Sequence, residues 1–107
     1  MSFNPGNMNK MMKQVQKMQR DMARVQEELG LMEIEATAGG GMVRAVFNGH
    51  GEIVDLDIAP EAVDPQDVEM LQDMVLAALK EGQRKAQTVA QEKMSAVTGG
   101  LNLPGGL

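Results

Sequence analysis

MNKMMKQVQKMQRDMARVQEEL, residues Met8–Leu29, carries two overlapping patterns that decide the fold. Apolar residues recur at steps of three and four, which predicts a helix with one apolar face. This apolar stripe consists of Met8, Met11, Val15, Met18, Met22, Val25 and Leu29. Basic residues recur at the same steps and form a cationic row of Lys10, Lys13, Lys17, Arg20 and Arg24. In a heptad frame the stripe occupies a and d and the row occupies c and f, so the row points away from the packing seam.

Three short segments after this helix have the pattern of strands. Leu31–Thr37 and Glu52–Ile58 alternate apolar with acidic residues, and Met42–Asn48 places apolar side chains opposite Arg44. Glycine-rich turns separate the segments, and the second turn, Asn48–Gly51, begins with an Asn-Gly pair that favours positive φ. Such short connections predict a three-stranded antiparallel meander. The side chains expected to face inward are Met32, Ile34, Ala36, Val43, Ala45, Phe47, Val54, Leu56 and Ile58.

A second long helix is expected from about Pro65 to Val97, with Asp64 as its N-cap. Gly82 lies inside this helix, where glycine costs about 1 kcal/mol relative to alanine, so we expect another backbone to approach closely there. The first helix is expected to end near Gly30 in a left-handed conformation. Residues 1–7, with a turn at Pro5-Gly6-Asn7, and residues 99–107 are expected to be flexible. The fold class is therefore α+β, with two long helices flanking the meander in the order α-β-β-β-α as a single domain over residues 1–107.

The composition limits the core that one chain can build. Eleven of the 107 residues are Met and two are Phe, and the chain contains no Trp or Tyr. Methionine packs adaptably but specifies a core weakly, and a chain of this size buries only a modest share of its surface. We therefore expect subunit association to supply the missing burial.

Charge is distributed unevenly along the chain. The net charge of the chain is −5. Residues 1–30 nevertheless carry five basic and three acidic residues, whereas residues 31–60 and residues 61–107 each carry a net negative charge. A phosphate polyanion would be repelled by most of the protein and accepted by the first helix. Glutamines flank the row and can donate hydrogen bonds to phosphate. The competing interpretation is that the row is an ordinary solvated helix face.

No other feature of the sequence indicates a chemical site. His50 is the only histidine and lies in a turn, and the glycine-rich segments lead into strands, whereas a phosphate loop leads into a helix. Asp55 and Asp57 share a strand face that is expected to be polar in any case. We therefore predict no catalytic residues, no metal, no cofactor and no small-molecule substrate.

The sequence predicts a cytoplasmic protein that has no contact with membranes. Residues 1–7 contain no apolar leader region, and no apolar run approaches membrane-spanning length. The chain contains no cysteine, which is compatible with a reducing compartment.

The sequence resembles the YbaB/EbfC family of bacterial nucleoid-associated proteins over nearly all of its length. The segments that carry the resemblance are the Met/Gln/Lys-rich first helix, AGGGMVRAVFNGHGEIVDLDI (Ala38–Ile58), EMLQDMVLAALKEGQRKAQ (Glu69–Gln87) and QEKMSAVTGGLNLPG (Gln91–Gly105). The resemblance implies a homodimer with paired sheets and projecting helices in a tweezer-like shape. It also implies DNA binding with little sequence preference and an influence on nucleoid organisation and gene expression.

The leading hypothesis is a non-enzymatic, homodimeric protein of the nucleoid that binds the phosphate backbone of double-stranded DNA. The residues predicted to contact DNA are Lys10, Lys13, Lys17, Arg20 and Arg24. The alternative is a protein-interaction or scaffold module that works through its Met-rich helix and has no direct role on DNA.

Overall fold

The computed structural model describes residues 5–99 and has the predicted order of elements. The elements are α1 (Pro5–Leu31), β1 (Ile34–Ala38), β2 (Val43–Phe47), β3 (Ile53–Ile58), a short 3-10 helix η1 (Pro60–Ala62) and α2 (Val68–Thr98). Both strand pairs are antiparallel and the sheet order is β1-β2-β3, so the predicted meander is confirmed. The expected flexibility of residues 1–4 and 100–107 concerns positions outside the described residues.

The ends of α1 differ from the prediction. Pro5-Gly6-Asn7 is helical, and not a turn, because proline is well tolerated in the first turn of a helix. Gly30 is also inside the helix and does not have a positive φ. The Leu29 carbonyl instead accepts a hydrogen bond from the Gly49 N–H at 2.7 Å. The loop after β2 therefore supplies a hydrogen-bond donor to a carbonyl group at the end of α1. In that loop Gly51, with a φ of 81°, and not Gly49, has the left-handed conformation.

The start of α2 also differs from the prediction. The N-cap is Asp67, whose carboxylate accepts a hydrogen bond from the Met70 N–H at 3.1 Å. Asp64, the expected cap, instead accepts from the Gln66 N–H at 2.9 Å and closes a turn before the helix. Both aspartates have a local sequence suitable for an N-cap. Because Asp64 closes a turn, α2 begins at Val68, three residues after the expected start at Pro65.

The core lies between α2 and the face of the sheet formed by β1 and β2. Phe47 and Val43 are fully buried, and Ala78, Gly82 and Ala86 form the buried side of α2. A Cβ atom at Gly82 would overlap the ring of Phe47, so the close neighbour at this glycine is an aromatic ring and not the expected backbone. The small residues of α2 therefore make room for the largest side chain of the core.

Strand β3 lies at the edge of the sheet and is not covered. Val54, Leu56 and Ile58 were expected to face inward, but they are 58%, 40% and 38% exposed. Leu56 and Ile58 pair with Ala45 and Val43, so they lie on the same sheet face as the core. They are nevertheless exposed because α2 packs over β1 and β2 and leaves the third strand open.

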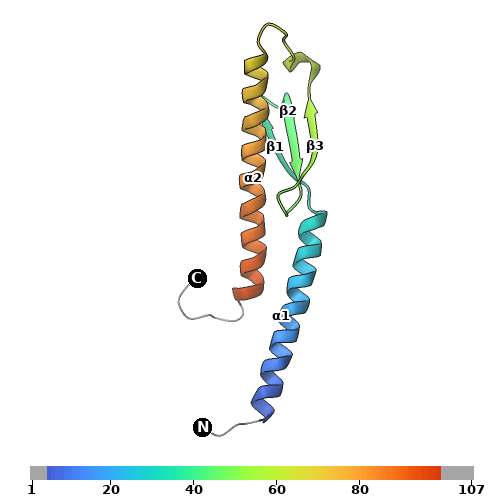
Figure 1. Cartoon of the computed structure of the whole chain (residues 1–107), viewed down its shortest axis with the longest axis vertical. Helices are drawn as coiled ribbons and strands as arrows, with labels where there is room; N and C mark the ends of the chain where they lie inside the picture. Colours follow the sequence, from blue (N-terminus) through green and yellow to red (C-terminus); the bar gives the residue numbers. More distant parts are fainter. Residues whose placement is uncertain (1–4, 100–107) are drawn as a thin grey trace.

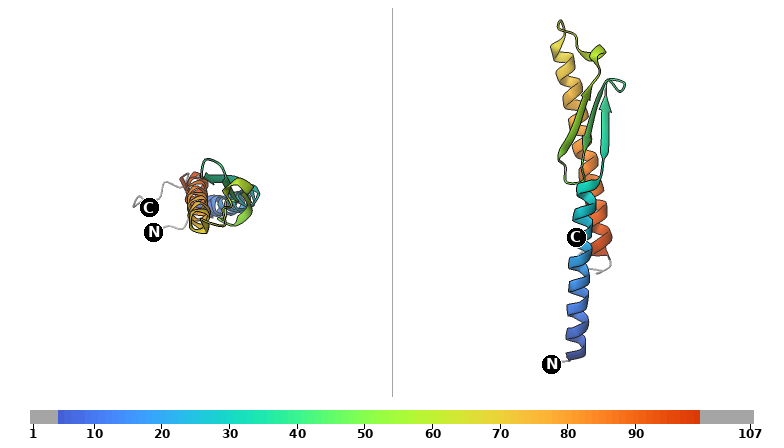
Figure 2. Two further views of the ribbon diagram at one scale, coloured as in Figure 1. Left: turned by 90° about the horizontal axis from the view of Figure 1, so that it is seen from above. Right: turned by 90° about the vertical axis from the view of Figure 1, so that its right-hand side faces the viewer.

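The molecule is strongly elongated. Its extents are 77 × 26 × 15 Å and its radius of gyration is 21.1 Å, whereas a compact domain of 100 residues has a radius of gyration of about 13 Å. The sheet lies beside the first part of α2, and α1 runs antiparallel to the last part of α2 and continues beyond its end (Figures 1 and 2). The amino-terminal half of α1 therefore projects from the body of the subunit.

Candidate nucleic-acid interface

The cationic row lies along the solvent-exposed side of α1. All five of its residues are exposed. At about 1.5 Å per residue, Lys10 and Arg24 are separated by roughly 21 Å along the helix axis. A regular helix of this length holds the row in a fixed line, so the row can follow an extended anion.

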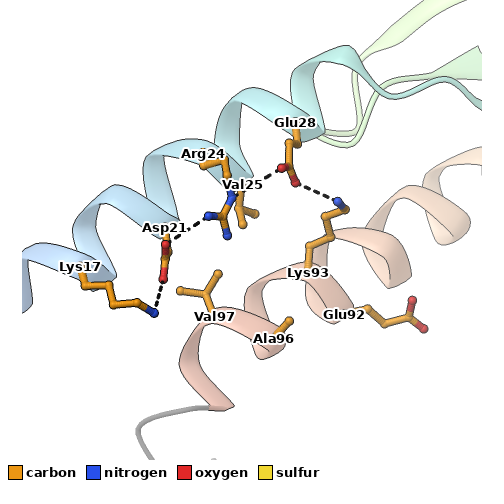
Figure 3. A pocket seen from close by; sticks show the side chains of 9 residues that line it. All are labelled: Lys17, Asp21, Arg24, Val25, Glu28, Glu92, Lys93, Ala96 and Val97. Carbon is orange, nitrogen blue, oxygen red and sulfur yellow. Dashed lines mark hydrogen bonds and ion pairs between the residues drawn. The ribbon is translucent and has the colours of Figure 1, made fainter. Parts of the chain in front are cut away.

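Two residues of the row, Lys17 and Arg24, form ion pairs within the chain, as Figure 3 shows. Asp21 lies 3.3 Å from the Lys17 ammonium and 3.2 Å from the Arg24 guanidinium. Arg24 also lies 3.6 Å from Glu28. The sequence prediction treated the five cations as equivalent and missed these ion pairs. The spacing of the residues nevertheless predicts these pairs. Helical side chains three or four residues apart lie next to each other, and this spacing separates the successive residues Lys17, Asp21, Arg24 and Glu28.

Glu28 also joins α1 to α2. Lys93 on α2 donates a hydrogen bond to the Glu28 carboxylate at 2.9 Å. This hydrogen bond, followed by the positive charge of Lys93, lowers the pKa of Glu28 from its ordinary value of 4.5. The two helices line a shallow cleft of about 450 Å³ with mixed charges, including Lys17, Arg24 and Lys93 with their acidic partners. Because the cleft carries both signs of charge, it is poorly suited to a polyanion.

The projecting part of α1 has a different charge balance. Within the described residues, Lys10, Lys13 and Arg20 form no ion pair, and no acidic residue precedes Asp21 in the sequence. We call these three residues the distal trio. Over residues 5–99 these three charges are available to a ligand without breaking an existing ion pair, whereas Lys17 and Arg24 are already paired.

The basic residues of α2 are mostly engaged. Arg84 binds Glu81 through two hydrogen bonds, which raise the pKa of Arg84 and lower the pKa of Glu81. Lys85 donates a hydrogen bond to the Glu35 carbonyl at 2.9 Å. Lys80 is exposed and has no such partner among the described residues. The second helix therefore offers less free positive charge than α1.

The uncovered face of the sheet is acidic. Arg44 lies 2.8 Å from Glu35 and 2.8 Å from Asp57, with Asp55 at 3.8 Å. The hydrogen bonds to Glu35 and Asp57 raise the pKa of Arg44. One arginine among three carboxylates leaves this face negative, so it would repel a nucleic acid.

The described residues contain no group of three or more His, Cys, Asp or Glu that could hold a metal ion. His50 is exposed in its turn, and the neighbouring Asn48 is buried and holds the loop by accepting hydrogen bonds from the His50 and Glu52 N–H groups.

Over residues 5–99, no helix combines the length and the apolar character needed to cross a membrane.

Comparison with known proteins identifies the family to which this chain belongs. Residues 4–101 match the model of the YbaB/EbfC DNA-binding family. A nucleoid-associated protein of Pelotomaculum thermopropionicum is 61% identical over 94% of this chain and 95% of its own length. A nucleoid-associated protein of Desulforamulus reducens is 58% identical, with the same shares of each chain covered.

The same fold is present in a solved structure. The crystal structure of an uncharacterized protein, HP0035 from Helicobacter pylori, aligns with a TM-score of 0.68 over 85% of this chain and 92% of that chain, at 24% identity. The family model and the two relatives confirm the resemblance found in the sequence, and the chain belongs to the YbaB/EbfC DNA-binding family.

Proposed function

We propose that the protein is a nucleoid-associated protein that binds double-stranded DNA as a homodimer, with low sequence specificity, through the cationic row of α1. The observation that carries this proposal is the distal trio, because its three charges are exposed, form no ion pair among the described residues and lie far from the acidic sheet. Lys17 and Arg24 would contribute less, since a phosphate must compete with Asp21 and Glu28 for them.

Low specificity follows from the residue types in the row. Base edges are read mainly by bidentate side chains such as arginine, and Arg20 is the only arginine of the distal trio. Lysine binds phosphate as a point charge and carries little sequence information. The chain has no Trp or Tyr, so base stacking on aromatic side chains, as in single-strand binding proteins, is disfavoured.

The homodimer is supported by the exposed apolar surface beside β3. Ile58 together with Leu71, Val75, Leu76 and Leu79 of α2 lines an open apolar groove of about 450 Å³. We call this surface the edge groove. Within the described residues β3 has no neighbouring strand on its outer side, and a free strand edge favours pairing with another strand. A second copy of the chain would cover both features, and two subunits would present two cationic rows to one duplex.

The nucleoid assignment rests on the relatives, which carry the name nucleoid-associated protein. Binding that depends on phosphates and not on base sequence suits a protein that acts at many chromosomal positions. Its influence on gene expression would then follow from occupancy of the DNA.

A salt-dependent titration tests DNA binding by the row. Two distal trios in a dimer could neutralise about six phosphates, so log affinity should fall with log salt at a slope of about −5. The variant K10Q/K13Q/R20Q should bind much more weakly, and its remaining affinity should depend less steeply on salt concentration. Duplexes of equal length and unrelated sequence should bind the unaltered protein with similar affinity.

The matched control is K80Q/R84Q/K85Q, which lowers the net charge by the same amount on α2 and leaves the Lys93–Glu28 contact with α1 in place. It should retain most of the affinity and the salt slope. Equal losses in the two triple variants would show that affinity follows net charge and would refute the assignment to α1.

Light scattering tests the dimer, with an expected mass of twice 11.5 kDa. The variant Leu76→Glu places a charge in the edge groove and should give a folded monomer. Ala77→Glu is the control, because Ala77 is exposed on the same helix but does not line the groove. A Leu76→Glu protein that remains dimeric would place the subunit interface elsewhere.

A further inference from the structure

We propose that the projecting end of α1 pairs with the same segment of a second copy of the chain, as two antiparallel helices joined along their apolar stripes. Met8, Met11, Met12 and Val15, which we call the tip patch, line an open apolar groove of about 340 Å³ that Gln16 borders. The four residues of the tip patch are 44–63% exposed. The described residues therefore leave an apolar surface uncovered where α1 extends past the end of α2 (Figures 1 and 2).

The shape of the groove fits a helix. Met11, Met12 and Val15 lie three, four and seven positions after Met8. In a coiled coil, four residues at this spacing form the hole that receives one side chain of the facing helix. The same stripe already packs against a helix further along the chain, because Val25 is only 4% exposed where α1 runs beside α2. We therefore expect a helix to occupy the tip patch.

The charge pattern of the segment allows this helix to be another copy of α1. From Pro5 to Arg20, every position that flanks the seam (e and g in the heptad frame) holds an uncharged residue, with Met12, Gln14 and Gln19 at its centre. The cations lie at c and f, so two paired copies would place no like charges beside the seam. An acidic partner would find no cation there, and an uncharged seam such as that of α1 itself is favoured.

The position of α2 determines the direction of the second helix. The Gln26 amide lies 3.9 Å from the Met94 sulfur. Continuing this antiparallel register brings Thr98, the last residue of α2, to about the level of Met22. A parallel copy of α1 would run into α2, which covers the stripe beyond this level. An antiparallel copy has its body at the other end of the seam and avoids this clash.

The length of the projecting segment suits an antiparallel pair. When Val15 of the second copy enters the hole in the tip patch, it faces Met11 of the first copy. In this register Pro5 of the second copy lies at the level of Asp21, next to the end of α2. The overlap is then about 24 Å long. The paired helix therefore begins where α2 ends.

The seam is short, which limits the strength of the pair. It contains little more than two heptads, so we expect it to bury less than a stable interface, which covers about 1,200–2,000 Å². Pairing should be weak in dilute solution and frequent where copies are concentrated on one polymer. Because the cationic rows lie on the outer sides of the pair, two paired copies would hold two duplexes; this consequence rests on the proposed function.

Engineered cysteines test the pairing in the full-length protein, at high protein concentration and without DNA. The sequence contains no cysteine, so the introduced thiols are the only ones present. In an equimolar mixture of the M11C and V15C variants, mild oxidation should form the mixed disulfide about tenfold faster than K13C forms its own disulfide. The K13C control is matched, because the two Lys13 positions lie at the same level of the pair but on its opposite outer faces. Intact masses of the denatured chains identify each product.

A second variant tests the groove itself. Adding M12E to both cysteine variants places a charge in the hole, and it should lower the rate of the mixed disulfide to that of K13C. Met12 is 55% exposed, so the helix should remain folded, which circular dichroism verifies.

Three outcomes would overturn the proposal. Equal rates for the mixed and the K13C disulfides would mean that the apolar stripe does not direct the pairing. An M11C–M11C disulfide that forms faster than the mixed one would show a parallel pair. A mixed disulfide that M12E does not slow would exclude the groove as the contact. The measurement contains no DNA, so a failure of DNA binding would leave its result unchanged.

Discussion

Replacing Gly82 by alanine should destabilise the fold, although the substitution improves the intrinsic preference for a helix. The added methyl group would overlap two ring carbons of Phe47 and lie 3.2 Å from the ring Cζ atom. Phe47 is fully buried and cannot turn away into solvent. Overpacking of this kind costs about 1–3 kcal/mol, and alanine recovers about 1 kcal/mol as the better helix former.

We take the upper end of the overpacking range because two ring atoms are overlapped, which gives a net loss of about 2 kcal/mol. For a domain of this size the melting temperature should fall by roughly 8–16 °C. Urea unfolding followed by far-ultraviolet circular dichroism measures the change without an aromatic fluorophore. Protein concentration must be held constant, because association into the proposed dimer would contribute to apparent stability.

Two further variants make this test specific. Gly99→Ala should be nearly neutral, since Gly99 has a helical φ of −61° and a Cβ atom there meets nothing within 4 Å. In a Phe47→Leu background, Gly82→Ala should cost less than in the unaltered protein, with a coupling energy of about 1 kcal/mol or more. A Gly82→Ala protein as stable as the original would refute the argument that this glycine accommodates the ring.

Two other predictions follow from the junction of α1 with the rest of the subunit. Gly49→Ala should lower the free energy of unfolding by about 1–3 kcal/mol in the same urea assay, because its methyl group would lie 2.8 Å from the Leu29 Cα atom; an unchanged urea midpoint would contradict this. Lys93→Met should produce a small loss of stability near neutral pH. The pKa of Glu28 is lowered in the folded protein, so the stabilisation by Lys93 is present above the ordinary value of 4.5 and disappears as the pH falls through the lowered pKa. Urea midpoints of the two proteins should therefore converge in acid, and a constant difference across this range would exclude Glu28 as the cause.

The order of elements could be predicted because each has a local periodic signal. The alternation in β1 and β2 identified the side chains that contact α2, and Ile34, Ala36, Val43, Ala45 and Phe47 are all buried. The prediction that the apolar side chains of β3 are buried was wrong. Alternation shows which side chains share a face of a strand, but it does not show whether another element covers that face.

The helix ends could not be predicted because they depend on partners distant in sequence. Leu29 binds the Gly49 N–H across the subunit, which no local rule could identify. Asp64 and Asp67 both satisfy the local rule for a cap, and only the turn before α2 distinguishes them.

The candidate site was predictable as a helix face but not as a set of equivalent charges. Periodicity placed all five cations on the exposed side of α1. Asp21 lies four residues after Lys17 and three residues before Arg24, a spacing that predicts ion pairs with both cations. The regular spacing of the five basic residues alone does not show that two of them are paired. Whether the distal trio contacts DNA stays a prediction.

The projection of α1 beyond α2 has a consequence for how this protein can change over evolutionary time. Residues 6–17 are all exposed, so substitutions on their polar side remove no burial from the core. If this part of α1 binds DNA as proposed, single substitutions can raise or lower the affinity at little cost to folding. The surface charge of this helix could therefore change between related bacteria while the sheet and α2 keep their sequence and structure.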